Sequence, residues 1–310
     1  MKDVNTTYGV LKDYLNLRMH SSDQPASVLI TGPTEFETPY GTLIPQYEVE
    51  DLGRKEHKYV LFHPNGTVRK VPLQDALDIE TKYGTLSAEM VLFYNNGALK
   101  KLFPLTGKLS GYWTEKNEYG LAKNLSLALP SGDITAKIIS LGFLKSGNIQ
   151  SITLWPGEII SVQTAAGLIE TRTGIAFYEN GNVKSLEPLH PTAVKTAIGT
   201  VEAFDNDPDG ISGDLNSLNF DLEGTISSLY TTSSQVTVTI DSETEKNYQP
   251  TEKESLCSES VKVSVPLMIE FLGDQVRFNQ SSDDVYDVAA CSFKIEKYVA
   301  DLKIPCYECS

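Results

Sequence analysis

An aspartate-rich stretch contains residue types that could bind a metal ion. Asp205, Asp207 and Asp209 alternate there before a glycine. Calcium loops place oxygen ligands at alternating positions in this way before a sharp turn. Asn216 stands where an EF-hand needs a bidentate glutamate, so a calcium site here would have another geometry, with Asp214 as its fourth carboxylate. We expect these four aspartates either to bind calcium weakly or to form an acidic, solvated hairpin loop.

Two groups combine tryptophan with glutamate. Trp113 lies beside Glu115 and Glu118, and Trp155 lies beside Glu158. Paired carboxylates next to aromatic rings suit a carbohydrate site, because the rings stack on sugars and the carboxylates act as acid and base. We expect these five residues to bind a ligand on one face of the protein, or else Trp113 to pack under its own loop and Trp155 to anchor a turn.

All four cysteines fall in the last 54 residues. Cys306 and Cys309 have the spacing of a redox or metal pair, and Cys257 and Cys291 could complete a four-thiolate zinc site. Cys291 also alternates with Phe293, as a buried strand residue would. Plain thiols, a zinc site and a redox pair all remain open. The four histidines are scattered, and no zinc-protease, phosphate-loop or dinucleotide-binding motif is present.

The charge of the chain excludes some partners. The chain has 26 basic and 41 acidic residues, which gives a formal charge of −15. Nucleic acids and anionic membranes bind mainly to basic surfaces, so we expect neither as a partner. No apolar run reaches the ~18 residues of a spanning helix, and the chain opens without an apolar signal segment, so we expect a cytoplasmic protein. Residues 201–260 alone hold 13 acidic and two basic residues, so calcium or a basic partner would bind there.

The elements that must position these groups follow from an internal repeat. A first phrase reads Phe, three residues, Gly, one residue, aliphatic, and it begins five times, at Phe62, Phe93, Phe143, Phe177 and Phe220. Asn-Gly and Ser-Gly pairs in it supply the positive φ angles of tight hairpin turns. The Phe before each turn and the aliphatic residue after it should therefore pack across neighbouring strands.

A second phrase alternates with the first. It reads Thr, two residues, Gly, one residue, aliphatic, and it begins at Thr6, Thr38, Thr81, Thr164 and Thr196. The first three copies are tighter still, because each reads Thr-x-Tyr-Gly-x-Leu. One hairpin cannot bury its apolar face alone, whereas stacked neighbours can. The spacing of the first-phrase glycines varies from 31 to 50 residues, which favours an open array over a closed barrel or propeller.

The clearest copies of the first phrase, residues 93–100 and 177–184, resemble the MORN-variant repeats of bacterial antitoxin-type repeat proteins. The resemblance covers about eight residues in each of five copies. It implies stacked β-hairpins and a binding or scaffolding role, without a catalytic residue that could be carried over.

These patterns predict an all-β fold: an elongated antiparallel β-hairpin repeat array, or solenoid-like sheet, with a small C-terminal β unit. We expect the array over residues 1–240, an acidic polar linker over 241–260, and over 261–310 the small unit with the cysteine cluster. The leading functional hypothesis is a non-enzymatic scaffold that presents a β surface to an unknown protein partner. The alternative is a carbohydrate-binding or glycoside-processing protein that uses the aromatic and glutamate residues of the long insertions.

Overall fold

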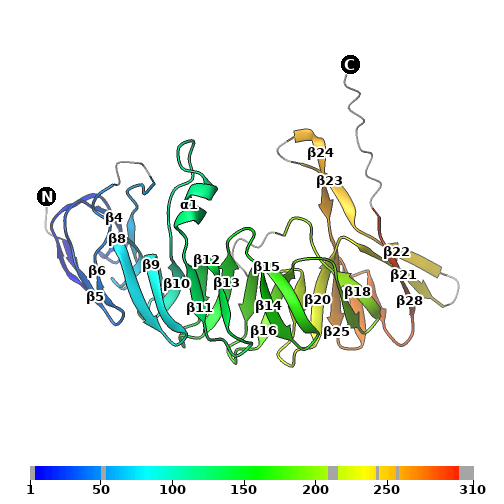
Figure 1. Ribbon diagram of the computed structural model, residues 1–310. Helices are drawn as coiled ribbons and strands as arrows, with labels where there is room; N and C mark the ends of the chain where they lie inside the picture. The colour runs from blue at the N-terminus through cyan, green and yellow to red at the C-terminus, as the bar shows by residue number, and fades with distance from the viewer. Residues whose placement is uncertain (1–3, 50–53, 209–215, 242–243, 256–257, 300–310) are drawn as a thin grey trace, which may run out of the picture. The chain divides into compact units, whose positions relative to one another are not determined.

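The chain is an all-β protein (Figure 1). The computed structural model describes residues 4–49, 54–208, 216–241, 244–255 and 258–299. These residues form 28 strands and one short helix, α1 (Glu115–Leu121). Seventeen strands belong to one large antiparallel sheet, and the rest form small sheets of two or three strands. No helix among the described residues is long and apolar enough to cross a membrane.

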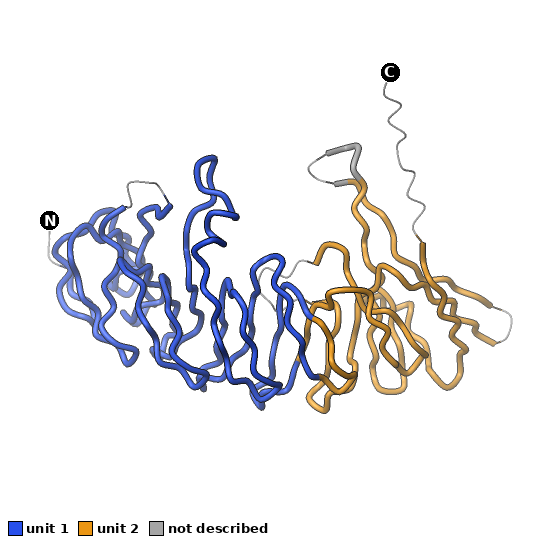
Figure 2. Tube along the Cα trace, in the orientation of Figure 1, with its two compact units in different colours: residues 1–163, 171–183, 210–214 blue, residues 164–170, 184–209, 215–310 orange. Residues whose placement is uncertain are grey.

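Contacts divide the chain into two compact units (Figure 2). The first unit comprises residues 1–163, 171–183 and 210–214, and the second comprises residues 164–170, 184–209 and 215–310. The division expected from the sequence, at residues 240 and 260, stays a prediction. Strands β14 (Ile160–Thr164), β15 (Gly167–Phe177) and β16 (Val183–Pro188) contain residues of both units.

In the first unit, each strand of the large sheet pairs antiparallel with the next. The order is β3 (Tyr14–Met19), β4 (Pro25–Ile30), β7 (Val60–Phe62), β8 (Val68–Thr81), β9 (Gly84–Phe93), β10 (Leu99–Phe103), β12 (Ile134–Phe143), β13 (Ile149–Leu154) and β15. β11 (Asn124–Leu127) pairs with the first half of β12. Two small hairpins complete the unit, β1 (Val4–Thr6) with β2 (Gly9–Leu11) and β5 (Phe36–Thr38) with β6 (Gly41–Leu43).

The second unit repeats this antiparallel pairing. Its part of the large sheet runs in the order β16, β19 (Leu218–Phe220), β20 (Ile226–Thr231), β25 (Leu267–Leu272), β26 (Gln275–Phe278) and β27 (Val285–Asp287). Three further sheets are β17 (Thr192–Thr196) with β18 (Gly199–Ala203), β23 (Thr251–Ser255) with β24 (Ser258–Val265), and β22 (Thr244–Tyr248), β21 (Ser234–Ile240) and β28 (Ser292–Lys297) in that order.

The hairpins of the first phrase have the geometry that the sequence predicts. Their glycines all have φ between +81° and +85°, which only glycine adopts without strain. In each turn the glycine N–H donates to the carbonyl of the residue after the phenylalanine, as Gly97 does to Tyr94 at 3.0 Å. Phe93 pairs with Leu99 across the turn, and the register then shifts by one residue, as in a bulged hairpin. The five phenylalanines are buried and fill the core.

The second phrase forms two-residue turns locked by its threonine. Thr38 Oγ1 donates to Gly41 O at 2.8 Å and accepts from Tyr40 N at 3.2 Å. The same pair of contacts occurs at Thr6, Thr81, Thr164 and Thr196. The threonine is needed because its hydroxyl satisfies two backbone groups that the turn leaves without a strand partner.

The tyrosine of the second phrase joins the two kinds of hairpin. The hydroxyls of Tyr8, Tyr40 and Tyr83 accept hydrogen bonds from the backbone N–H groups of Val68, Leu99 and Ile149, at 3.2, 2.8 and 3.1 Å. Each of these N–H groups lies two residues after a first-phrase glycine, where the bulge interrupts the ladder. The phenol of one hairpin therefore completes the backbone hydrogen bonding of another, about 60 residues away.

A second set of contacts links successive turns of the first unit. His20 Nε2 lies 3.1 Å from Phe62 O, and His63 Nε2 lies 3.0 Å from Phe93 O. Tyr94 Oη donates to Phe143 O at 2.9 Å in the same way. Two of the histidines that are scattered in the sequence thus contribute to the repeat structure, because each one contacts the carbonyl of the next first-phrase phenylalanine along the sheet.

The structure also differs from some expectations. The stretch 241–260, expected to be a linker, contains β22 and β23, whose mostly polar residues lie in solvent-exposed strands.

We predict that replacing Tyr40 with Phe lowers stability by about 1–2 kcal/mol. The change removes only the hydroxyl and leaves the Leu99 N–H without its partner. The measurement is urea-induced unfolding followed by circular dichroism. Tyr112→Phe is the matched control, because this side chain is 96% exposed and should leave the unfolding midpoint unchanged. Equal midpoints for Tyr40→Phe and the wild type would refute the structural role of the hydroxyl.

Candidate functional site

The most distinctive feature of the first unit is the insertion between β10 and β11, residues 104–123. It forms a loop that rises from the sheet and ends in α1 (Figure 1). Thr114 caps this helix: its hydroxyl accepts from Asn117 N, and the Asn117 side chain accepts from Thr114 N at 2.9 Å. This reciprocal cap lets a helix of seven residues form within an otherwise all-β chain.

A buried ion cluster fixes the base of the insertion. Arg54 donates through Nε and Nη2 to both oxygens of Glu118 on α1, at 2.8 and 2.7 Å. It also donates through Nη1 and Nη2 to both oxygens of Glu89 on β9, at 3.0 Å each. Lys55 Nζ lies 3.4 Å from Glu89. All four side chains are buried, and the two positive charges balance the two negative ones.

The loop backbone closes around the same carboxylates. Thr106 N donates to Glu89 at 2.9 Å, and Gly107 N donates to Glu118 at 2.7 Å. A Cβ at Gly107 would lie 2.2 Å from a Glu118 oxygen, so only glycine allows this approach. Trp113 Nε1 donates to Glu118 at 2.7 Å. Glu118 therefore receives hydrogen bonds from three separate parts of the chain.

These contacts shift two pKa values. Burial alone would raise the pKa of Glu118, but hydrogen bonds from Arg54, Trp113 and Gly107, together with the charge of Arg54, outweigh it and lower the pKa. Burial alone would lower the pKa of Arg54, and its bonds to Glu118 and Glu89 instead raise it. Both groups are therefore charged, as a buried pair must be to stabilise the loop.

The second predicted group, Trp155 and Glu158, contacts α1 through Tyr119. Tyr119 Oη donates to Glu158 Oε1 at 2.7 Å, which raises the pKa of Tyr119, and its ring packs edge-on against Trp155 at 5.9 Å. The second oxygen of Glu158 accepts from Lys137 N at 3.0 Å. Lys137 Nζ lies 3.7 Å from the centre of the Tyr119 ring, a cation–π contact.

The five residues expected to bind a ligand thus have different positions. Trp155 and Glu118 are buried, and Glu118 and Glu158 use both carboxylate oxygens in bonds to the protein. Glu115 is exposed on α1, and Trp113 is half-buried. The structure brings both tryptophan–glutamate groups to α1: Trp113 binds Glu118, and Trp155 and Glu158 contact Tyr119. A ligand-binding role for them stays a prediction.

The expected metal residues lie in the second unit. Asp205 and Asp207 follow β18, and Asp207 N donates to Asp205 Oδ1 at 3.1 Å. Asp209 and Asp214 lie outside the described residues, as do Cys257, Cys306 and Cys309. Within the described part of the chain, no three His, Cys, Asp or Glu side chains are grouped so that they could hold a metal ion. Calcium and zinc binding therefore stay predictions.

Sequence reasoning missed Arg54 and Glu89, which hold the site together. Arg54 lies 35 residues from Glu89 and 64 from Glu118, so no local pattern could pair them. The helix carried a weak signal, because Thr114 and Asn117 have the spacing of a capping box with Asn in place of the usual Glu or Gln.

We predict that Glu118→Gln destabilises the first unit by about 3–5 kcal/mol. The change keeps the shape of the side chain but removes a charge that faces buried Arg54. Urea unfolding measures the effect. Glu115→Gln, on the exposed side of the same helix, should change stability by less than about 0.5 kcal/mol. Equal losses for the two variants would rule out a special role for the buried pair.

The same cluster predicts a pH dependence. Because the pKa of Glu118 in the folded protein lies below its ordinary value of 4.5, the Glu118 interactions are complete above pH 4.5 and are lost as pH falls through the lowered pKa. The indole N–H signal of Trp113 in ¹⁵N NMR reports this directly, and it should move only below pH 4.5. In Glu118→Gln the signal should not titrate. A midpoint at or above 4.5 in the wild type would contradict the assignment.

Comparison of the chain with protein-family models, with curated proteins and with solved structures finds no match. The resemblance to MORN-variant repeats therefore stays a prediction. The functional argument rests on the geometry of the chain's own residues.

Proposed function

We propose that the protein is a non-enzymatic scaffold, an elongated solenoid-like array of β-hairpin repeats that presents a surface to another protein. The insertion 104–123 is its main contact element. The observation that carries this proposal is Tyr112, which is 96% exposed in the turn closed by the Ser110 N–Trp113 O hydrogen bond, on a loop whose base is held by buried charges. A fully exposed aromatic side chain on a fixed loop has no role in the fold of the chain itself.

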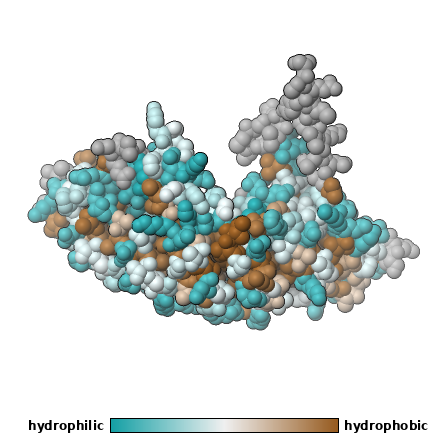
Figure 3. Space-filling view, in the orientation of Figure 1, coloured by the Kyte–Doolittle hydropathy of each residue, from teal (hydrophilic) through white to brown (hydrophobic). Residues whose placement is uncertain are grey.

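The composition of the loop supports protein binding. Leu109 and Leu121 are also exposed, on either side of Tyr112 in sequence. Figure 3 shows the loop as a pale projection, as expected for glycine, serine and aromatic residues of intermediate hydropathy. Tyrosine is among the residues that contribute most to interfaces, because it offers a large rigid surface and a hydroxyl at low entropic cost.

The way the loop is held adds to the argument. Lys108 N donates to Arg54 O at 2.7 Å, and the Lys58 ammonium donates to Thr106 O, so the arm of the loop that follows β10 is tied to residues 54–58. A loop fixed before binding loses less conformational entropy when a partner docks. Binding loops on rigid scaffolds commonly have this arrangement.

The alternative function, carbohydrate binding or glycoside processing, has less support. Its two best carboxylates, Glu118 and Glu158, already accept hydrogen bonds from Arg54, Trp113, Tyr119 and the backbone. A general acid or base needs a carboxyl oxygen free to reach the substrate. We therefore favour the scaffold.

The test is affinity capture on the immobilised 310-residue chain. We expect a specific protein partner to bind the wild type and to bind the double variant Leu109→Ser, Tyr112→Ser at least tenfold more weakly, which is about 1.4 kcal/mol or more. Both side chains are exposed, so the variant should unfold at the wild-type temperature.

Leu168→Ser is the matched control, because Leu168 is exposed to a similar degree and lies far along the chain from the loop. It should retain the partner fully. Capture of no specific partner would overturn the scaffold proposal. A partner held equally by the wild type and the double variant would overturn the role of the loop.

A further inference from the structure

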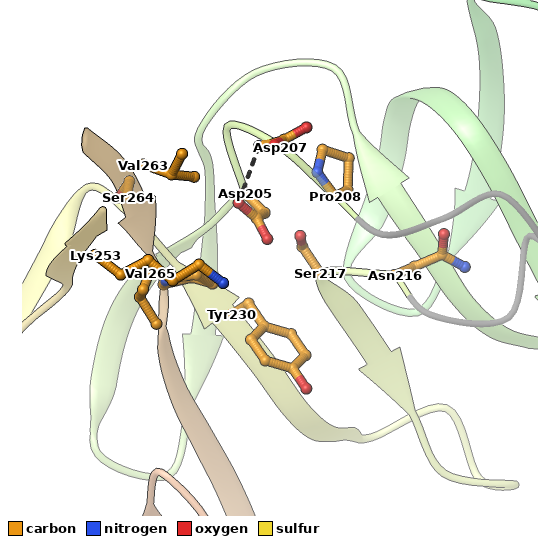
Figure 4. Close-up of a pocket in the computed structure, with 11 residues that line it drawn as sticks. Asp205, Asp207, Pro208, Asn216, Ser217, Tyr230, Lys253, Val263, Ser264 and Val265 are labelled. Carbon is orange, nitrogen blue, oxygen red and sulfur yellow. Dashed lines mark hydrogen bonds between the residues drawn. The ribbon is translucent and has the colours of Figure 1, made fainter. Parts of the chain in front are cut away.

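The second unit contains a cavity of about 300 Å³ at the base of the β23–β24 hairpin (Figure 4). Its walls come from four parts of the chain: the loop after β18, the two residues before β19, β20, and the hairpin with the residue that follows it. The side chains used below are Asp205, Asp207, Tyr230, Lys253, Val263 and Val265. A volume near the lower limit for ligand pockets indicates a small molecule rather than a polymer segment.

The cavity holds charges of both signs. Figure 4 shows Lys253 extending from β23 toward the space between Asp205 and Tyr230, with Asp207 above. In the described part of the chain, the Lys253 ammonium has no hydrogen bond or ion pair. Asp207 uses only its backbone N–H there, in the bond to Asp205. One ammonium and one carboxylate thus face the cavity with their bonding capacity available.

The rest of the wall is apolar or carries hydroxyls. Val263 and Val265 line one side, and the Tyr230 and Ser217 side chains lie across from them. Pro266 also lines the cavity. Apolar walls with a few convergent polar groups are typical of sites for small organic ligands. A bare divalent cation fits less well, because the Lys253 ammonium would repel it and the apolar side chains would supply no oxygen ligand.

We propose that this cavity binds a small zwitterion, a free amino acid with an apolar side chain. Its amine pairs with Asp207, its carboxylate pairs with Lys253, and its side chain packs on Val263 and Val265. Each end of the ligand meets a charge of opposite sign, and hydrogen bonds between charged partners are the strong ones. This site is separate in sequence and in its residues from the insertion of the first unit.

Isothermal titration calorimetry on the 310-residue chain tests the proposal, with L-leucine as the probe. We expect L-leucine to bind. N-acetyl-leucine lacks the amine charge and leucine amide lacks the carboxylate, so each should bind at least tenfold more weakly. These comparisons use only the wild-type protein and do not depend on the folding of any variant. Absence of binding by L-leucine, or equal binding of the three probes, would overturn the proposal.

Variants then locate the site. Lys253→Met and Asp207→Asn should each weaken L-leucine binding at least tenfold. Lys262→Met is the matched control, because Lys262 lies on the same hairpin but pairs with Glu252 at 3.0 Å, and it should bind L-leucine as the wild type does. Loss of affinity in the control alone, or in none of the three, would overturn the assignment of the cavity. If calcium chloride raises the melting temperature and L-leucine does not, the loop is a metal site and the proposal fails.

Discussion

The fold depends on satisfying the backbone N–H group that follows each bulged hairpin turn. A glycine at positive φ makes the turn possible but interrupts the strand ladder, and an N–H left without a partner there would cost about 1–3 kcal/mol. In three copies a tyrosine hydroxyl from a second hairpin fills this gap. The same contact that completes one turn therefore fixes the position of the other hairpin, so local turn chemistry determines long-range packing.

These hydrogen bonds between hairpin turns explain why the chain can carry long insertions. The spacing that repeats along the chain is needed only at the turns, so residues can be added between them without disturbing the sheet. The insertion with α1 still needs its own support, and Arg54 supplies it by forming paired hydrogen bonds with carboxylates on β9 and α1. A buried pair of this type adds little net stability but selects one position for the loop, which is what a binding element requires.

Much of the fold could be predicted from the sequence, because hairpins are encoded locally. Phe, Gly and the aliphatic residue after it defined the turns and the pairing of Phe93 with Leu99. Contacts between distant residues could not be read this way: nothing in the sequence pairs Arg54 with Glu118. The strands of 244–255 were missed because exposed strands of polar residues lack the apolar alternation that identifies a half-buried strand. The candidate site was found in part, through Trp113 and Glu118, but their role in holding the loop came only from the structure.

Hydrogen exchange resolved by NMR at the amides of Val68, Leu99 and Ile149 tests the central claim most directly, namely that tyrosine hydroxyls complete the repeat turns. If they do, these three amides are protected as strongly as the strand amides beside them and exchange only when the unit unfolds. Exchange as fast as that of exposed loop amides, while the neighbouring strands stay protected, would show that the contacts do not persist in solution and would contradict the claim.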